Sequence, residues 1–378
     1  MRTPICEKLG IEFPIFAFSH CRDVVAAVTN AGGFGVLGAL AFSPAQLDIE
    51  LAWIDKHVSG KPYGVDIVIP KKYVGKEDGD FAKVDLQKMI PETHKNFIDN
   101  LLKRYEVPKL ADEGEETEGL LGWSSSGGRA HVEVAMKYPI RLIVNALGPP
   151  PADVIELAHE RGIQVGALVG SVDHAVAQKQ AGVDIIIASG YEAGGHTGEI
   201  TSMVLWPQVV DAVKPTPVLA AGGIGSGRAM AAALALGTQG VWTGSIWLTT
   251  SETDYQPALV NKLLLANSKQ TVRSRCISGK PARMLKTTYT DAWEGEQSPG
   301  TLPMPLQFMA TAEASQRIYK YGQTNKPGSD ELLGSPVGQV VGQMNERRPA
   351  KNVVFDMVNE YIETIGGLSE QLNSTVEE

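Results

Sequence analysis

The chain has 378 residues, of which 43% are hydrophobic and 20% charged, and its formal net charge is -9. This composition excludes an intrinsically disordered or collagen-like chain, and the acidic excess argues against binding to nucleic acid or to an anionic membrane. Three cysteines without a CxxC spacing predict neither a disulfide framework nor a structural zinc site. Because the sequence shows neither a signal-peptide pattern nor an apolar run of about 18 residues, we expect a cytoplasmic protein.

Eight short apolar runs are predicted to be strands of one parallel sheet. Several follow a glycine that ends a helix-compatible segment, where glycine closes the last helical turn, and others follow proline-containing turns. Their continuous apolar character suits strands that helices cover on both faces. The runs are Ile15–Phe18, Phe34–Gly38, Tyr63–Val68, Arg141–Asn145, Gln164–Leu168, Asp184–Ala188, Pro217–Ala221 and Gly240–Thr243.

Segments with apolar residues at three- and four-residue spacing lie between these runs, and we expect them to be helices. Eight strands alternating with helices over about 250 residues favour the α/β class and a (β/α)8 TIM barrel. A doubly wound open sheet is the alternative, although its phosphate-binding glycines usually follow the first strand, and here they come late. The predicted helices are Asp23–Ala31, Pro44–His57, Ala152–Arg161, Val172–Ala181 and Ser226–Leu236.

Two regions depart from the alternation. Within the barrel expected over residues 10–250, residues 70–138 separate the third and fourth strands and are too long for one connecting helix. A solvated surface insertion is the simpler interpretation, and a lid is the alternative, since the segment leaves the carboxyl end of a barrel strand. Residues 251–378 are expected to form a helical extension with an amphipathic helix over Val353–Ile365.

Two glycine-rich turns follow the last two predicted strands. Gly222-Gly223-Ile224-Gly225 precedes a helix, and Thr243-Gly244-Ser245 ends the eighth strand. Glycine lets the backbone approach a phosphate closely, and the N–H groups at a helix start favour an anion. In (β/α)8 barrels the loops after strands seven and eight often form one phosphate site together. We therefore expect a phosphate site, although either turn alone would be read as a tight connection.

His196 is the strongest candidate for a catalytic side chain. It follows Gly194-Gly195 just after the sixth predicted strand, on the barrel face where chemistry is done. An imidazole can move a proton near neutral pH or, as imidazolium, stabilise an anion. The alternative is a histidine that only orders its loop, and His20 is a second, weaker candidate. No histidine or carboxylate spacing predicts a metal site.

Together these motifs resemble the nitronate monooxygenase family, once called 2-nitropropane dioxygenases. The resemblance implies an FMN-bound TIM barrel with its extension packing near the active-site face. It also implies oxidation of alkyl nitronates by O2 to a carbonyl compound and nitrite. The resemblance covers roughly residues 10–250 and is carried by Asn30–Gly35, Glu192–His196, Ala220–Ile224 and Thr243–Ser245, with a weaker match at Ser278–Arg283.

The resemblance also implies roles for single residues, with His196 as the active-site histidine. Where the family usually has an amide, this chain has Asp66 and Ser189, so these two cofactor contacts differ. The implied phosphate contacts are Gly222, Gly223, Gly244 and Ser245. The implied contacts to the flavin ring and ribityl chain are Ala17, Phe18, Ser189, Gly190 and Gly194, and the other implied cofactor-binding residues are Asp66, Gly195 and Thr243.

Other functions remain open at this point. Gly198–Met203 also resembles the flavin-dependent enoyl-acyl-carrier-protein reductases, which share this barrel, and NAD(P)H-dependent quinone reductases belong to the same superfamily. Outside enzymes, the alternative is a phosphate-ligand binding protein on the same barrel. The expected partners are a small-molecule substrate, a nitronate or a related compound, and O2. Nucleic acid and membrane are not expected, and a homo-oligomer is left open.

Overall fold

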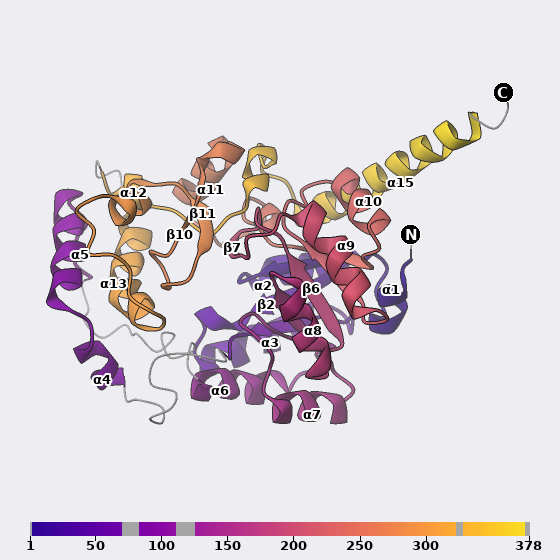
Figure 1. The fold of residues 1–378 in the computed structure, drawn as a ribbon, viewed down its shortest axis with the longest axis horizontal. Coiled ribbons are helices and arrows are strands. Elements are labelled where there is room, and N and C mark those ends of the chain that lie inside the picture. Colours follow the sequence, from indigo (N-terminus) through magenta and orange to yellow (C-terminus); the bar gives the residue numbers. More distant parts are fainter. Residues whose placement is uncertain (1, 70–82, 111–124, 323–327, 375–378) are drawn as a thin grey trace.

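A computed structural model describes residues 2–69, 83–110, 125–322 and 328–374. Its centre is a closed barrel of eight parallel strands in the order β1-β2-β3-β4-β5-β6-β8-β9 (Figure 1). The predicted (β/α)8 barrel is therefore confirmed, and each predicted strand lies within one residue of the observed ends. The barrel strands are β1 (Ile15–Ser19), β2 (Phe34–Gly38), β3 (Gly64–Ile67), β4 (Leu142–Asn145), β5 (Gln164–Val169), β6 (Ile185–Ser189), β8 (Val218–Ala221) and β9 (Gly240–Thr243).

Within the described ranges, seven helices that lie between consecutive barrel strands cover the outside of the barrel. The five predicted helices are present, with ends within one residue of those expected. Serine side chains begin three of them: Ser43, Ser171 and Ser226 each accept a hydrogen bond from a backbone N–H of the first turn. The helices are α2 (Arg22–Asn30), α3 (Pro44–His57), α6 (Ser125–Ala135), α7 (Ala152–Glu160), α8 (Val172–Gln180), α9 (Ser202–Val213) and α10 (Gly227–Ala235).

The barrel interior is filled by side chains that alternate along the strands. Phe16, Phe34 and Trp242 pack there with aliphatic residues of the other strands. The short helix α1 (Pro4–Leu9) adds Ile5 and Leu9 to this cluster. Since α1 precedes β1, it lies at the end of the barrel where the strands begin, and the opposite end, where they finish, is left for a binding site.

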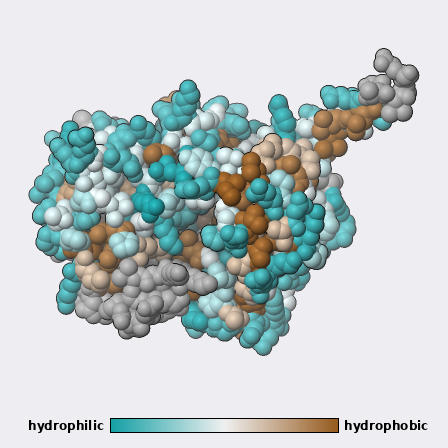
Figure 2. Space-filling view, in the orientation of Figure 1, coloured by the Kyte–Doolittle hydropathy of each residue, from teal (hydrophilic) through white to brown (hydrophobic). Residues whose placement is uncertain are grey.

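The C-terminal helix α15 (Ala350–Ser374) takes the place of the eighth barrel helix. It packs against both α10 and α2, and Gly227 N–H donates to Glu360 at 2.8 Å. We expected residues 251–378 to pack near the active-site face, whereas α15 packs on the flank of the barrel, where its Val354 and Met357 are buried. Its last turns project from the body with exposed apolar side chains (Figures 1 and 2).

An excursion of the chain separates β9 from α15. It contains α11 (Pro257–Leu265), α12 (Thr288–Glu294), α13 (Leu306–Tyr321), α14 (Ser329–Leu332), β10 (Thr271–Ser274) and β11 (Ala282–Leu285). The predicted helical extension is therefore present, and it also contains the two short strands β10 and β11, which were not predicted. Strand β11 pairs antiparallel with β10 and with the two-residue strand β7 (Gly195–His196), so this small sheet depends on contact with the barrel loop.

Part of the predicted insertion packs against this excursion rather than against the barrel. Helices α4 (Lys83–Lys88) and α5 (Glu92–Arg104) contact α13. The buried guanidinium of Arg317 in α13 donates to the backbone oxygens of Val107 and Pro108 at 2.9 and 2.8 Å. Residues 70–82 and 111–124, on which the lid alternative partly rests, lie outside the described residues. No described helix is long and apolar enough to span a membrane.

Candidate active site

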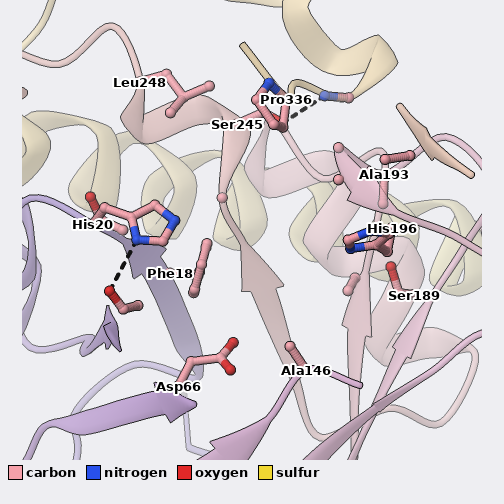
Figure 3. Close-up of a pocket in the computed structure, with 18 of the residues that line it drawn as sticks. Phe18, His20, Asp66, Ala146, Ser189, Ala193, His196, Ser245, Leu248 and Pro336 are labelled. Carbon is pink, nitrogen blue, oxygen red and sulfur yellow. Dashed lines mark hydrogen bonds between the residues drawn. The ribbon is translucent and has the colours of Figure 1, made fainter. Parts of the chain in front are cut away.

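A cavity of about 410 Å³ lies at the carboxyl ends of the barrel strands (Figure 3). Its volume falls in the range of small-molecule sites, about 300–1,000 Å³. Phe18 reaches it from β1, Asp66 from β3 and Ser189 from β6, while Ile277 and Phe308 of the excursion form part of the opposite wall. The predicted site residues that line it are Phe18, Asp66, Ser189, Gly194, Gly195, His196, Gly222, Gly223, Thr243, Gly244 and Ser245.

Two predicted site residues do not line this cavity. The side chain of Ala17 is fully buried with Ile15 in the cluster between the strands and the surrounding helices. Gly190 lies against α9, where an added Cβ would come within 2.1 Å of Ser202 Oγ. Gly190 thus allows the close approach of the β6 end to α9, and its role in the structure is packing.

The two glycine-rich turns lie side by side at the ends of β8 and β9, which pair in the barrel. Gly222 and Gly223 both adopt positive φ, +97° and +71°, a conformation that favours glycine. Ser245 begins a 3-10 helix, so N–H groups of its first turn lack an intrahelical acceptor. Backbone donors without bulky side chains are the groups that a phosphate requires.

A segment of the excursion holds the histidine loop against the second of these turns. Gln339 N–H donates to the backbone oxygen of Glu192 at 2.9 Å, and Gly338 N–H donates to Ser245 Oγ at 2.9 Å. An added Cβ on Gly194 would come within 2.7 Å of the Gly338 nitrogen. Only a residue without a side chain fits this contact, so Gly194 is needed for packing as well as for its place in the cavity.

His196 lies on β7, where it pairs with Ala282 of β11. Its Nε2 is 2.7 Å from Ser278 Oγ, and the Ser278 hydroxyl donates to the backbone oxygen of Lys280 at 3.4 Å. The short contact fixes the ring orientation, and the tautomer of His196 decides which of the two groups donates in it.

Burial lowers the pKa of His196 to about 4, and the positive charge of Lys280 adds to this effect. The imidazole is therefore neutral at pH 7. A neutral imidazole can accept a proton, whereas stabilisation of an anion by imidazolium would first require a rise of this pKa. Such a rise follows when an anion binds beside the ring.

Asp66 is buried, with 5% of its surface exposed, and points into the cavity (Figure 3). Its Oδ1 has no hydrogen-bond partner among the described residues. Burial raises the pKa of this carboxyl well above its usual value, because it disfavours the charged form. A protonated carboxyl offers one donor and one acceptor, as an amide does. The site residues therefore fit FMN: a buried polar group without a partner faces a cavity with a phosphate cradle.

Sequence reasoning missed several groups of this site. Trp242 and Phe18 stack with ring centroids 6.2 Å apart and both line the cavity. Ser278, which positions His196, had a signal only in the weak family match at Ser278–Arg283. The three cysteines are buried. In the described part of the chain, no group of three or more His, Cys, Asp or Glu could hold a metal ion.

Fold and cavity are those of a (β/α)8-barrel enzyme with its site at the carboxyl ends of the strands. The model of the nitronate monooxygenase family matches residues 2–360. Over 371 residues the chain is 53% identical to "Putative monooxygenase Rv1533" of Mycobacterium tuberculosis, covering 97% of this chain and 98% of that protein. A "Probable nitronate monooxygenase" of Staphylococcus aureus is 27% identical and covers 95% and 97% of the two chains.

Two solved structures are similar over nearly the whole chain. Nitroalkane oxidase from Streptomyces ansochromogenes has a TM-score of 0.77 and 25% identity, with 96% of this chain and 99% of that chain covered. FabK from Thermotoga maritima has a TM-score of 0.71 and 27% identity, with 98% and 99% covered. The chain belongs to the nitronate monooxygenase family and is a flavin-dependent oxidoreductase.

Proposed function

We propose that this enzyme uses FMN to oxidise alkyl nitronates with O2, giving a carbonyl compound and nitrite. The observation that carries the proposal is that one cavity brings together His196 and the glycine turns after β8 and β9. The reactive histidine and the cofactor phosphate would thus share one site. The likeness to nitroalkane oxidase from Streptomyces ansochromogenes supports the same reaction class.

The barrel residues would hold the cofactor. Backbone N–H groups of Gly222, Gly223, Gly244 and Ser245 would bind the phosphate. Phe18, Asp66, Thr243 and the ends of β6 and β7 would border the ring and ribityl chain, and Asp66 in its protonated form could donate or accept one hydrogen bond. The absence of a dinucleotide fingerprint between a first strand and helix favours FMN over FAD.

His196 would act on the substrate. When bound, FMN supplies the electron chemistry, taking electrons from the nitronate and passing them to O2. A neutral nitroalkane must first lose its α-proton, and the imidazole of His196 is the base that would accept it. A nitronate arrives already deprotonated, so with that substrate His196 would serve mainly to orient the anion. In the balanced reaction, two nitronates and one O2 would give two carbonyl compounds and two nitrite ions: each C=N bond breaks as nitrite leaves, and each carbonyl oxygen comes from O2.

Anaerobic mixing of the FMN-loaded protein with substrates tests this function. Ethylnitronate should reduce the flavin, and admitting air should produce nitrite and consume oxygen. The likeness to FabK keeps a pyridine-nucleotide-dependent reductase as the competing function. Rapid bleaching by NADH or NADPH, without nitronate-dependent oxygen uptake, would replace our proposal by that one.

The cofactor itself is identified first, by denaturing the purified protein and analysing the released chromophore. We expect a yellow protein that releases FMN. A colourless protein that takes up no FMN on reconstitution would leave only the phosphate-ligand binding protein as an interpretation.

A further inference from the structure

A second cavity, of about 680 Å³, adjoins the candidate active site. The two cavities share one wall, which therefore forms their junction. Ile277 of this wall directly precedes Ser278, whose hydroxyl binds His196 Nε2, so the junction lies close to the catalytic candidate. The shared residues are His20, Leu40, Tyr255, Ile277, Phe308 and Pro336.

The side chains that line the second cavity suit an uncharged alkyl chain of a ligand. None of the described residues that line it is Asp, Glu, Lys or Arg. A charged ligand would lose its hydration there without gaining a counter-ion, which is strongly unfavourable. Its aliphatic lining includes Leu259, Met284, Leu285, Ala312, Ile318 and Leu333.

Helix α13 forms one side of this cavity with a single face. Phe308, Thr311, Ala312, Ser315 and Tyr319 all line it, and their spacing of three and four residues places them along one stripe of the helix. Strand β11 and the segment after α14 complete the lining with Met284, Leu285 and Leu333. The second cavity is thus built mainly by the excursion, whereas barrel loops supply most of the first.

We propose that the second cavity binds the unbranched alkyl tail of the substrate, whose reacting head lies beside His196. This assignment rests on the proposed function for the identity of the head group, and it adds a substrate class: long-chain rather than short-chain nitronates. In this assignment the tail passes between the six residues that line both cavities, and the lining without charged side chains provides the affinity. A head held near Ser278 and His196 places its first methylenes at Ile277 and Phe308.

Steady-state kinetics with nitronates of increasing length tests the proposal. We expect kcat/KM to rise from ethyl- through hexyl- to decylnitronate, by about two- to fourfold for each methylene that is buried. Ethylnitronate, which is too short to pass the junction, sets the baseline. A kcat/KM that is flat or falls along the series would overturn the assignment of the second cavity.

Variants of α13 place the effect in the cavity. In Ala312→Phe, kcat/KM should no longer rise with the length of the nitronate, while ethylnitronate turnover should stay near that of the wild type. Lys320→Phe adds the same ring on the same helix, at an exposed position that lines neither cavity. In this variant kcat/KM should still rise with chain length. If Ala312→Phe does not fold, Ser315→Phe tests the same point from an exposed position on the lining. If kcat/KM still rises with chain length as in the wild type when Ala312→Phe or Ser315→Phe is folded, the proposal is contradicted.

A binding measurement separates this proposal from the proposed function. Straight-chain carboxylates from propanoate to decanoate are non-reacting probes, and their affinity is read from the change in flavin absorbance. Tighter binding with length, lost in Ala312→Phe, supports the tail site even if nitronates are not turned over. Turnover of ethylnitronate together with length-independent carboxylate binding would leave the function intact and refute the tail site.

Discussion

Burial shifts the pKa of two ionisable residues of the cavity toward the neutral form. It lowers the pKa of His196 and raises the pKa of Asp66, because in each case it disfavours the charged form. Burial thus acts against a negative charge on Asp66, which would repel an anionic substrate such as a nitronate. The same substrate would meet a neutral imidazole able to take up a proton.

Replacement of His196 distinguishes a role as a base toward nitroalkanes from a role in orienting the nitronate anion. His196→Asn should lower kcat/KM for a neutral nitroalkane by about 10²–10⁴-fold, the usual contribution of proton transfer. The loss with the matching nitronate should be smaller, because that substrate needs no base. With the wild type, nitroalkane activity should stay level as pH falls below neutral and decline only as pH approaches 4, where the imidazole becomes protonated.

The control for this experiment is His174→Asn, the same change at an exposed histidine on α8. It should leave both activities unchanged. Equal losses with nitroalkane and nitronate in His196→Asn would show that the ring stabilises the bound anion instead. Loss of FMN together with activity would show that it only orders the loop.

Asp66→Asn tests the protonated carboxyl through cofactor affinity. At pH values below the pKa of Asp66 the variant should bind FMN about as tightly as the wild type, because an amide also offers a donor and an acceptor. As pH rises past the pKa of Asp66, the wild type should lose up to about tenfold in FMN affinity per pH unit, and the variant should not. Fluorescence titration of FMN against pH gives both curves.

The pH dependence of the stability of the apoprotein gives a second, independent test of the raised pKa of Asp66. The folded state holds the Asp66 proton to higher pH than the unfolded chain, whose carboxyl has a pKa of about 3.9. Stability from this group is full below that value and is lost as pH rises toward the folded-state pKa. Urea unfolding of Asp66→Asn should lack this loss. Identical pH dependence in both proteins would mean that Asp66 is ionised when folded.

At the scale of elements, the turn after β8 is the most exacting part of the predicted phosphate site. Gly223→Val should weaken FMN binding by at least about tenfold. Valine is strained at φ +71°, and its Cβ would lie 3.2 Å from Glu192 Cγ. Equilibrium titration with FMN measures the effect.

Gly60→Val is the matched control for that change. Gly60 has a nearly equal φ of +74°, and an added Cβ would meet nothing within 4 Å. Both variants should lose similar stability from backbone strain, about 1–3 kcal/mol, but only Gly223→Val should lose FMN affinity. Equal FMN affinity in the two variants would show that the phosphate does not bind at this turn.

The elements that sequence alone predicted are those with strong local signals. Each barrel strand is a continuous apolar run bounded by glycine or proline, and the helices carry three- and four-residue spacing. Strands β7, β10 and β11 have two to four residues and exist because they pair with one another. Nothing local marks such strands, so residues 251–378 were expected to be helical. Among site residues, glycines and His196 stood in recognisable motifs, whereas Trp242 and Ser278 gained their places through tertiary contacts.

Across the whole molecule, the chain leaves the barrel after β9 and returns to it only with α15. The segment between them contributes part of the cavity wall, the partner of His196 and the clamp on the histidine loop. In the order of the sequence this segment follows the barrel as a C-terminal extension. In the folded molecule it is an insertion between the last barrel strand, β9, and the last barrel helix, α15. Only the packing of α15 between α10 and α2 reveals this arrangement.

The small sheet of β7, β10 and β11 has an evolutionary consequence. It joins the histidine loop to a segment that takes no part in closing the barrel, so the two sides of the site can change at different rates. Substitutions on α13 or β11 can reshape the space for a substrate while the barrel turns keep their glycines and their cofactor. A lineage built on this plan can acquire new substrates by drift in one segment, with its flavin chemistry inherited unchanged.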